Sequence, residues 1–321
     1  MQMMETLSNN PLLKVSDAEI AKIRRDYNLD TNKIKENLDE IEEWCKKQSH
    51  LEGAVQYLNR DIMERIHILA KGSVEGTKKK IDKILTTRGL IPEIMLNKSI
   101  DEFNKFQENL IFITLPNLSP VCHSRIFVSQ ITNPNINNFS FLTFLRYCFM
   151  IGEYRLYFEY SMSDRFIVDL KNVNMNIIAK INPVLLKKGE TLCTCVLFQE
   201  AYGTKIKGIH FVNAPPYVDK IINLLKQVLK EKISSRVYVH SSYEDLQKEI
   251  PKEILPKEYG GDSTSCAELA EQWKEYLKTE QARTILETSN KLISDESKRC
   301  SIKFNEEYLG MPGSFRRLNV D

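Results

Sequence analysis

Histidine and cysteine side chains supply many metal and catalytic sites, and in this sequence they are scattered. No two of the five histidines have the H-x-x-x-H spacing that places two metal ligands on one helix face. His210 and His240 lie inside apolar, strand-like runs, where a single histidine is more typical of a core than of a catalytic site. Cys193 and Cys195 form a C-x-C pair with no second cysteine or histidine pair nearby. We therefore expect packed thiols there and no metal site.

The carboxylate of Asp169 closes the apolar run R-F-I-V-D-L, where it could act as a general base. We favour a structural role, in which it accepts hydrogen bonds from backbone or arginine donors. The sequence contains no G-x-G-x-x-G, no Walker A and no G-x-S-x-G motif. We therefore expect a protein that is not an enzyme and that uses no cofactor.

A helix with one apolar face is predicted after Pro215 and Pro216, because two prolines end a strand and suit the first turn of a helix. Its apolar residues recur at helical spacing, at Val218, Ile221, Ile222, Leu225, Val228 and Leu229. Lysines flank this face, and two interpretations stay open. The stripe packs on a core, as most such helices do, or it meets a membrane, where each lysine near anionic headgroups is worth ~1 kcal/mol.

The elements that would position these groups change in character along the chain. Helical patterning occupies the first ninety residues, with an S-D-x-E start signal at Ser16. From Leu90 onward five short β-like runs alternate with helical stretches, which predicts an α/β fold with a mixed, partly parallel sheet. The runs cover residues 110–115, 125–131, 165–170, 208–213 and 236–240. Helical patterning returns after Gly261, so we expect an N-terminal bundle at 1–90, an α/β domain at 91–261 and a C-terminal segment at 262–321.

Composition places the chain among folded proteins of ordinary charge. Its 321 residues carry a formal net charge of +2, which gives no reason to expect a nucleic acid as partner. The seven cysteines are odd in number, and the first residues lack the basic start and apolar run of a signal peptide. The longest apolar-rich region is interrupted by charged residues. We expect a cytoplasmic protein with reduced thiols.

Three sequence blocks between residues 205 and 261 resemble the CRAL-TRIO lipid-transfer family, in its branch of α-tocopherol transfer protein and cellular retinaldehyde-binding protein. They are G-I-H-F-V-N-A-P-P with its following helix, R-V-Y-V-H, and I-P-K-E-I-L-P-K-E-Y-G-G. R-F-I-V-D-L and N-P-V-L-L-K-K extend the resemblance upstream. The resemblance implies a small helical bundle and an α/β domain whose sheet floors an apolar cavity. One amphipathic helix, here at residues 217–229, would close that cavity as a lid.

Alignment with the family also implies which residues form the sites. The cavity lining would consist of Leu145, Cys148, Phe149, Gly152, Val168, Val218, Ile221, Leu225 and Leu229. A phosphoinositide site would consist of Lys205, Lys207, Lys232 and Arg236. Ile68 stands where the family has an arginine from the bundle, with Arg65 one turn away, and the segment 188–199 is longer than in the tocopherol carrier.

We therefore expect an intracellular carrier that binds one hydrophobic lipid, such as a retinoid, a tocopherol or another terpenoid-like molecule, and transfers it at membranes. A phosphoinositide-responsive sensor or adaptor and a phospholipid exchanger remain alternatives. A lipid enzyme would need a paired acid and base inside the cavity, and the sequence shows none. We expect a monomer that contacts membranes transiently and binds no nucleic acid.

Overall fold

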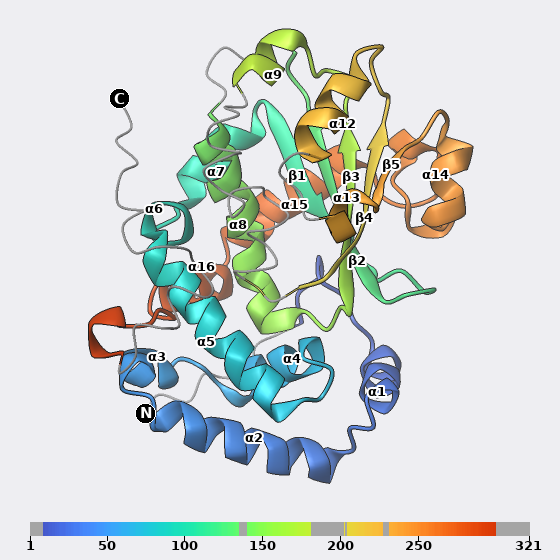
Figure 1. The fold of residues 1–321 in the computed structure, drawn as a ribbon. Helices are drawn as coiled ribbons and strands as arrows, with labels where there is room; N and C mark the ends of the chain where they lie inside the picture. The colour runs from blue at the N-terminus through green and yellow to red at the C-terminus, as the bar shows by residue number, and fades with distance from the viewer. Residues whose placement is uncertain (1–8, 135–139, 181–201, 203, 227–230, 300–321) are drawn as a thin grey trace.

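The N-terminal part of the protein is a helical bundle, seen at the bottom of Figure 1. The computed structural model describes residues 9–134, 140–180, 202, 204–226 and 231–299. Ser16 and Glu19 form a reciprocal capping box, which confirms the predicted helix start. Asp30, Asn59 and Ser73 cap three further helices. The helices are α1 (Asp17–Asp26), α2 (Thr31–Lys46), α3 (Glu52–Val55), α4 (Arg60–Leu69) and α5 (Val74–Leu90), with a 3-10 turn at Ser49–Leu51.

A five-stranded sheet forms the centre of the second part, with its strands side by side in chain order. The strands are β1 (Leu110–Thr114), β2 (Ser124–Ile131), β3 (Ser163–Asp169), β4 (Ile206–Val212) and β5 (Val237–Val239). β1 runs antiparallel to β2, and the other three pairs are parallel. The expected mixed α/β sheet is thereby confirmed, with every strand within two residues of its predicted ends.

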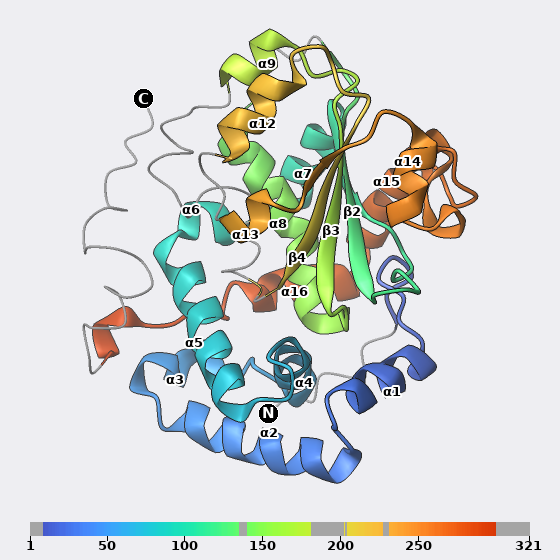
Figure 2. The same ribbon diagram turned by 45° about the vertical axis from the view of Figure 1, so that its right-hand side comes forward.

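Helices cover both faces of the sheet (Figure 2), as a sheet with parallel strands requires. One face carries α8 (Phe141–Phe158), α12 (Val218–Lys226) and α13 (Glu231–Ser234). The other carries α14 (Tyr243–Glu249) and α15 (Cys266–Leu277). The remaining elements are α6 (Pro92–Met95), α7 (Ile100–Gln107), α9 (Met175–Lys180), α16 (Glu280–Ser289) and 3-10 turns at Lys252–Ile254, Lys257–Tyr259 and Glu296–Lys298. Residues 227–230, between α12 and α13, lie outside the described residues.

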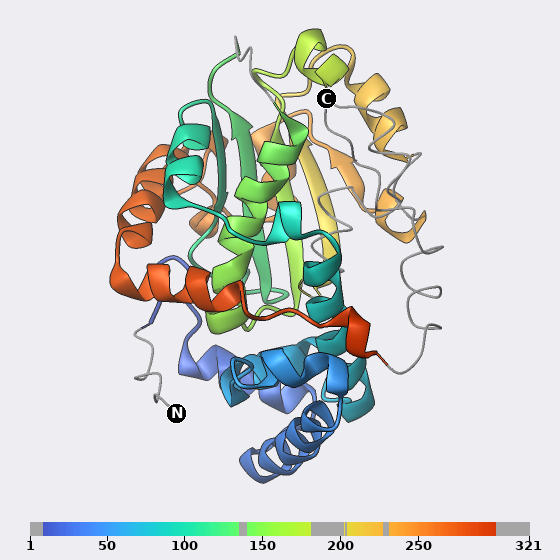
Figure 3. The same cartoon turned by 90° about the vertical axis from the view of Figure 1, so that its left-hand side faces the viewer.

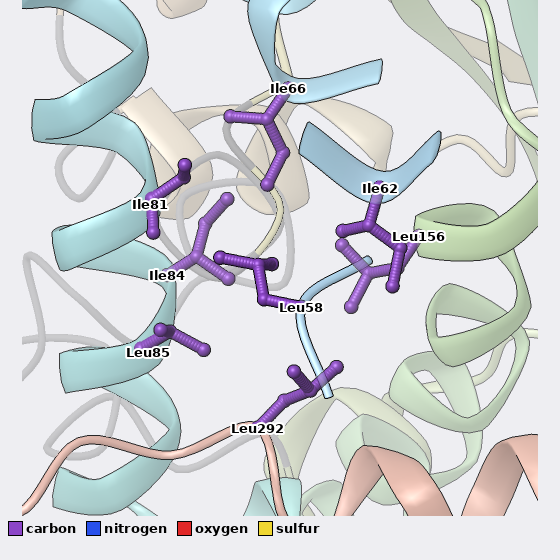
Figure 4. Close-up of a pocket in the computed structure, with 8 residues that line it drawn as sticks. All are labelled: Leu58, Ile62, Ile66, Ile81, Ile84, Leu85, Leu156 and Leu292. Carbon is purple, nitrogen blue, oxygen red and sulfur yellow. The ribbon is translucent and has the colours of Figure 1, made fainter. Parts of the chain in front are cut away.

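The bundle and the α/β domain share one apolar core, shown in Figure 4. Leu156 of α8 and Leu292 of the C-terminal segment reach side chains of α4 and α5. The cavity left between them is only about 10 Å³, so these side chains are packed closely. The lining residues are Leu58, Ile62, Ile66, Ile81, Ile84, Leu85, Leu156 and Leu292. The three-part division at residues 90 and 261 stays a prediction, and packing crosses both boundaries.

A buried charge cluster joins the same parts. Arg88 of α5 forms an ion pair with Glu153 of α8, 2.9 Å between Nη1 and Oε2, and both side chains are at most 1% exposed. Arg88 also donates to the carbonyl oxygens of Ser289 and Leu292. Lys98 contacts Glu153 at 2.8 Å, and burial lowers the pKa of this lysine to about 8. The guanidinium therefore holds α5, α8 and the C-terminal segment together.

The C-terminal segment continues along the bundle after α16 (Figure 3). Ser294 and Asp295 donate their backbone N–H groups to the carbonyls of Leu85 and His50. Arg299 donates to both carboxylate oxygens of Asp82, at 2.9 and 3.1 Å. Residues 290–299 thus form a strap across the bundle.

Candidate functional site

The face of α8 that was predicted to line a cavity is buried and apolar. Leu145, Cys148, Phe149 and Gly152 are spaced so that they share one side of the helix. Leu145 is 2% exposed, and Cys148 and Phe149 are fully buried. Ser140 caps the helix by accepting from the N–H of Thr143, which fixes where this face begins.

Gly152 faces an aromatic ring. A Cβ atom at this position would lie 2.5 Å from the ring of Tyr202, a distance that side chains do not tolerate. The Tyr202 hydroxyl donates to the carbonyl oxygen of Phe149 at 2.9 Å. The ring of Phe149 lies 5.7 Å from that of Tyr202, centroid to centroid. Glycine at 152 therefore lets this tyrosine lie directly against α8.

The sheet presents an apolar surface on the side of α8 and α12. The strand registers place Phe166 opposite Ile209, and Val168 opposite Phe211. Since side chains alternate between the two faces of a strand, these four residues share one face. Val168 is half-buried, and Val239, aligned with Phe211 on β5, is 43% exposed. The predicted floor residue therefore belongs to an apolar surface that is incompletely covered near β5.

The expected lid helix begins where it was predicted. Pro215 and Pro216 precede α12, and the hydroxyl of Tyr217 donates to the carbonyl of Val173 at 2.5 Å. Val218 and Ile222 pack against the core and stay partly exposed. The backbone of Ile221 and Leu225 belongs to α12, but their side chains and all of Leu229 lie outside the described residues. The structure thus shows where this helix begins, and it describes the side chains of Val218 and Ile222 from its apolar face.

The predicted basic residues lie near the amino ends of β4 and β5. Lys205 is half-buried, and Lys207 and Lys232 are exposed. Arg236 donates from Nη1 to the carbonyl of Ile206, so it also braces the start of β4. The basic character of this region is concentrated on the side of the sheet nearest the bundle.

Two further lysines come from the bundle, and sequence analysis did not find them. The pKa of Lys205 is lowered to about 8, first by burial and then by neighbouring positive charges. These charges belong to Lys71, Lys80, Lys207 and Lys232. Lys71 is the second residue after α4, and Lys80 is in α5. The lysines of both parts of the protein thus form one basic cluster, defined here as Lys71, Lys80, Lys205, Lys207 and Lys232.

The two bundle positions singled out by sequence have other roles. Ile68 is 1% exposed and belongs to the apolar core. The guanidinium of Arg65 lies 4.9 Å from the centroid of the Tyr160 ring, in a cation–π contact. Lys71, three residues after Ile68, is exposed at the end of α4. The bundle therefore supplies its positive charge from a different position than the family arginine.

Asp169 has the structural environment that its position suggested. One carboxylate oxygen accepts from the backbone N–H of Lys171 and from Asn213, each at 2.9 Å. The other accepts from the hydroxyl of Tyr259 at 3.2 Å. Its donors are thus a backbone amide, an amide side chain and a tyrosine, not an arginine. These bonds fix the carboxyl ends of β3 and β4 against the segment after α14.

The histidines and cysteines form no metal site in the part of the chain that the structure describes. His210 is fully buried between Arg165 and His240, within hydrogen-bonding distance of both. The four cysteines that are described have free thiols. Cys193 and Cys195 lie outside the described residues. Over the same ranges no helix combines the length and the apolar character needed to cross a membrane.

Comparison with known proteins matches one part of the chain, which includes α8, α12 and strands β2 to β5, to a known domain. Residues 121–261 match the CRAL/TRIO domain. The chain is 34% identical over 96 residues to "Alpha-tocopherol transfer protein-like" of Mus musculus, an alignment that covers 30% of this chain and 26% of that protein. The human protein of that name matches at 34% over 96 residues, covering 30% of this chain and 27% of the relative. "Clavesin-1" of Rattus norvegicus is 33% identical over 97 residues, covering 30% of this chain and 26% of the relative.

These alignments span about a quarter of the length of the curated relatives. Among solved structures, the crystal structure of Sfh5 has a TM-score of 0.47 and 14% sequence identity, covering 75% of this chain and 92% of that one.

Proposed function

We propose that this protein, whose residues 121–261 match the CRAL/TRIO domain, is a cytoplasmic carrier of one hydrophobic lipid, which it exchanges at membranes. The observation that supports this most is the apolar surface shared by α8 and the sheet. Leu145, Cys148 and Phe149 face inward from the helix, while Val168 and Phe211 lie on the sheet face that α8 and α12 cover. Surfaces of this kind bury most of a lipid-sized ligand and need few polar groups to orient it.

The proposed ligand is a single terpenoid-like molecule, such as a retinoid or a tocopherol. Burial of apolar ligand surface is worth roughly 25 cal/mol per Å², which is ample for tight binding of such a molecule. The resemblance to proteins of the tocopherol and retinaldehyde branch supports a terpenoid over a phospholipid.

The proposed lid is α12 with the residues that follow it. Its apolar side would close the ligand cavity in the free protein and meet lipid when the protein docks. The prolines before it and the hydrogen bond from Tyr217 to Val173 fix its first turn, so opening would occur by movement of its far end. That far end leads to α13, which carries Lys232 of the basic cluster.

The basic cluster is the proposed site for a phosphoinositide headgroup. Like charges at close range oppose one another, and here they add to burial, the larger cause, in lowering the pKa of Lys205. A multiply charged phosphate would relieve this repulsion and form charge-assisted hydrogen bonds. The cluster contains residues of the bundle, of β4 and of α13. Headgroup binding would therefore change the position of α13 and, with it, the opening of the lid.

We propose no catalytic activity. Asp169 and His210 lie on the sheet face opposite to Val168 and Phe211, because side chains alternate along β3 and β4. Both are engaged in hydrogen bonds with neighbouring side chains. These two groups, the acid and the base that the sequence singled out, are therefore directed away from the proposed ligand.

A transfer assay tests this function. Donor vesicles would carry a fluorescent tocopherol or retinoid, and acceptor vesicles would contain phosphatidylcholine with or without a bisphosphorylated phosphoinositide. We expect the protein to accelerate transfer, and the phosphoinositide to accelerate it further. Phosphoinositide binding without any transfer of the terpenoid would instead support a lipid sensor, the second candidate that the basic cluster favours.

A further inference from the structure

We propose that Tyr202 is the end wall of the ligand cavity on the side of the bundle and sets the longest ligand that the protein accepts. This inference rests on the proposed carrier function. It concerns which molecules fit, which neither the CRAL/TRIO match nor the names of the relatives specify.

One stripe of side chains along α8 faces two different regions of the protein. Leu145, Cys148, Gly152 and Leu156 follow one another at intervals of three or four residues, so they lie along one side of the helix. Leu156, at the far end, packs into the core shared with Ile62 and Ile66 of the bundle (Figure 4). Leu145 and Cys148, at the near end, belong to the proposed cavity. The stripe must therefore contain a boundary between cavity and bundle.

Tyr202 lies at that boundary. Its ring touches the helix at Gly152, between the cavity end and the bundle end of the stripe. The same ring also lines a small cavity of about 20 Å³ with Ile66 and Leu69 of α4. One side chain therefore contacts both α8 and the bundle, and it separates the two parts of the stripe.

The ring is held firmly in this position. Tyr202 is 2% exposed, and its hydroxyl donates to the carbonyl of Phe149 and lies 3.5 Å from Glu153 Oε1. Glu153 is itself fixed by ion pairs with Arg88 and Lys98. A ligand that displaced the ring would leave the hydroxyl without its buried partner, which is unfavourable.

The region behind the ring is too small for an apolar chain. The small cavity there measures about 20 Å³, which is room for little more than one water molecule, and Ile66 and Leu69 line it together with Arg65, Arg155 and Glu159. Arg155 forms ion pairs with Asp164 at 2.6 Å and with Glu159 at 3.4 Å. A hydrocarbon tail that entered this space would have to push apart packed side chains and the buried ion pairs of Arg155, which is unfavourable. The space that a ligand could occupy therefore ends at Tyr202.

A homologous series of straight-chain fatty alcohols tests this directly. For wild-type protein we expect Kd to fall about fourfold with each added methylene, up to a limiting chain length beyond which it stops falling. Tyr202→Leu, which shortens the side chain but stays apolar, should move that limit to longer alcohols. Tyr202→Phe keeps the ring but loses the hydroxyl that anchors it, so its limit should lie close to that of wild type and below that of Tyr202→Leu.

The possible outcomes are separable. An unchanged limit in a folded Tyr202→Leu protein would overturn the inference while leaving the carrier function intact. If wild-type protein binds no alcohol of the series and no terpenoid, the proposed function fails and the inference with it. Should Tyr202→Leu fail to fold, wild-type protein still gives an answer. A fatty alcohol of the limiting length with a terminal diazirine should label Tyr202 on irradiation, and labelling elsewhere would contradict the end-wall role.

Discussion

His210 and His240 lie on neighbouring parallel strands and share a hydrogen bond of 2.9 Å between Nδ1 of the first and Nε2 of the second. Arg165 contacts the other nitrogen of His210, Nε2, at 3.3 Å. An arginine can only donate, so His210 Nε2 must accept, and the proton of the neutral ring lies on Nδ1. The bonds therefore run in one direction, from Arg165 to His210 to His240, and a proton added to either ring would disrupt them.

These hydrogen bonds predict that the free energy of unfolding decreases as the pH is lowered. Burial, followed by the charges of Arg165 and His240, lowers the pKa of His210 to about 3, and burial lowers the pKa of His240. The unfolded chain takes up these protons near pH 6.5, whereas the folded protein does not. The stabilisation by neutral histidines is thus fully present above pH 6.5 and declines below it, by about 1.4 kcal/mol per pH unit for His210.

Urea unfolding at several pH values between 7 and 5 measures this decline. His210→Gln keeps a hydrogen-bonding side chain that does not titrate, so the free energy of unfolding should depend less on pH in this variant. Equal pH dependence in wild type and variant would show that His210 is not the responsible group.

The ion pair of Arg88 and Glu153 predicts that replacing Arg88 alone lowers the free energy of unfolding more than replacing both residues does. Arg88→Met leaves the carboxylate of Glu153 buried with less compensation and should lower the free energy of unfolding by ~3–5 kcal/mol. Arg88→Met combined with Glu153→Gln should cost less than the single change. Lys274→Ala, which breaks an exposed pair with Glu271, is the control and should change stability by less than ~1 kcal/mol. A double variant less stable than the single one would argue against the pair as the link between α5 and α8.

The lid assignment predicts the effect of one charge on α12. Leu225→Asp would place an unpaired carboxylate against the proposed cavity and should reduce ligand retention severely. Asn223→Asp adds the same charge at an exposed position of the same helix and should retain ligand. Retention is measured as the fraction of protein with bound lipid after gel filtration, with the fold checked by circular dichroism. Full retention by a folded Leu225→Asp protein would remove α12 from the cavity.

The two bundle lysines of the basic cluster, Lys71 and Lys80, are predicted to strengthen binding to phosphoinositide vesicles. Lys71→Ala and Lys80→Ala should each weaken binding to phosphoinositide vesicles by about fivefold, since a lysine near an anionic surface is worth ~1 kcal/mol. Lys278→Ala, at an exposed position directly after α15, should leave binding unchanged. Flotation assays with vesicles of defined phosphoinositide content give these affinities. If only substitutions of Lys205 and Lys207 weaken vesicle binding, the headgroup does not contact the bundle.

Much of the fold could be predicted because its signals are local. The β-branched runs of β2, β3 and β4 and the capping residues Ser16 and Ser73 fix elements within a few residues of the chain. The family resemblance predicted which helix should act as the lid. The helix α12 begins within one residue of the predicted start of that lid.

The rest depends on contacts between distant parts of the chain. The Lys71 and Lys80 side chains lie near Lys205 only because the bundle packs against the sheet, and no spacing in the sequence encodes that packing. Similarly, the contact of Tyr202 with Gly152 joins residues fifty positions apart. A lone glycine in an apolar helix is a weak signal of close approach, and it does not name the partner.

The most direct test of the proposed carrier function is native mass spectrometry of the protein purified from its natural source, followed by extraction and identification of what it holds. The proposal predicts one lipid per protein molecule, of a single terpenoid class. Protein without lipid, or with a broad mixture of phospholipids, would contradict it and would favour the sensor or the phospholipid exchanger.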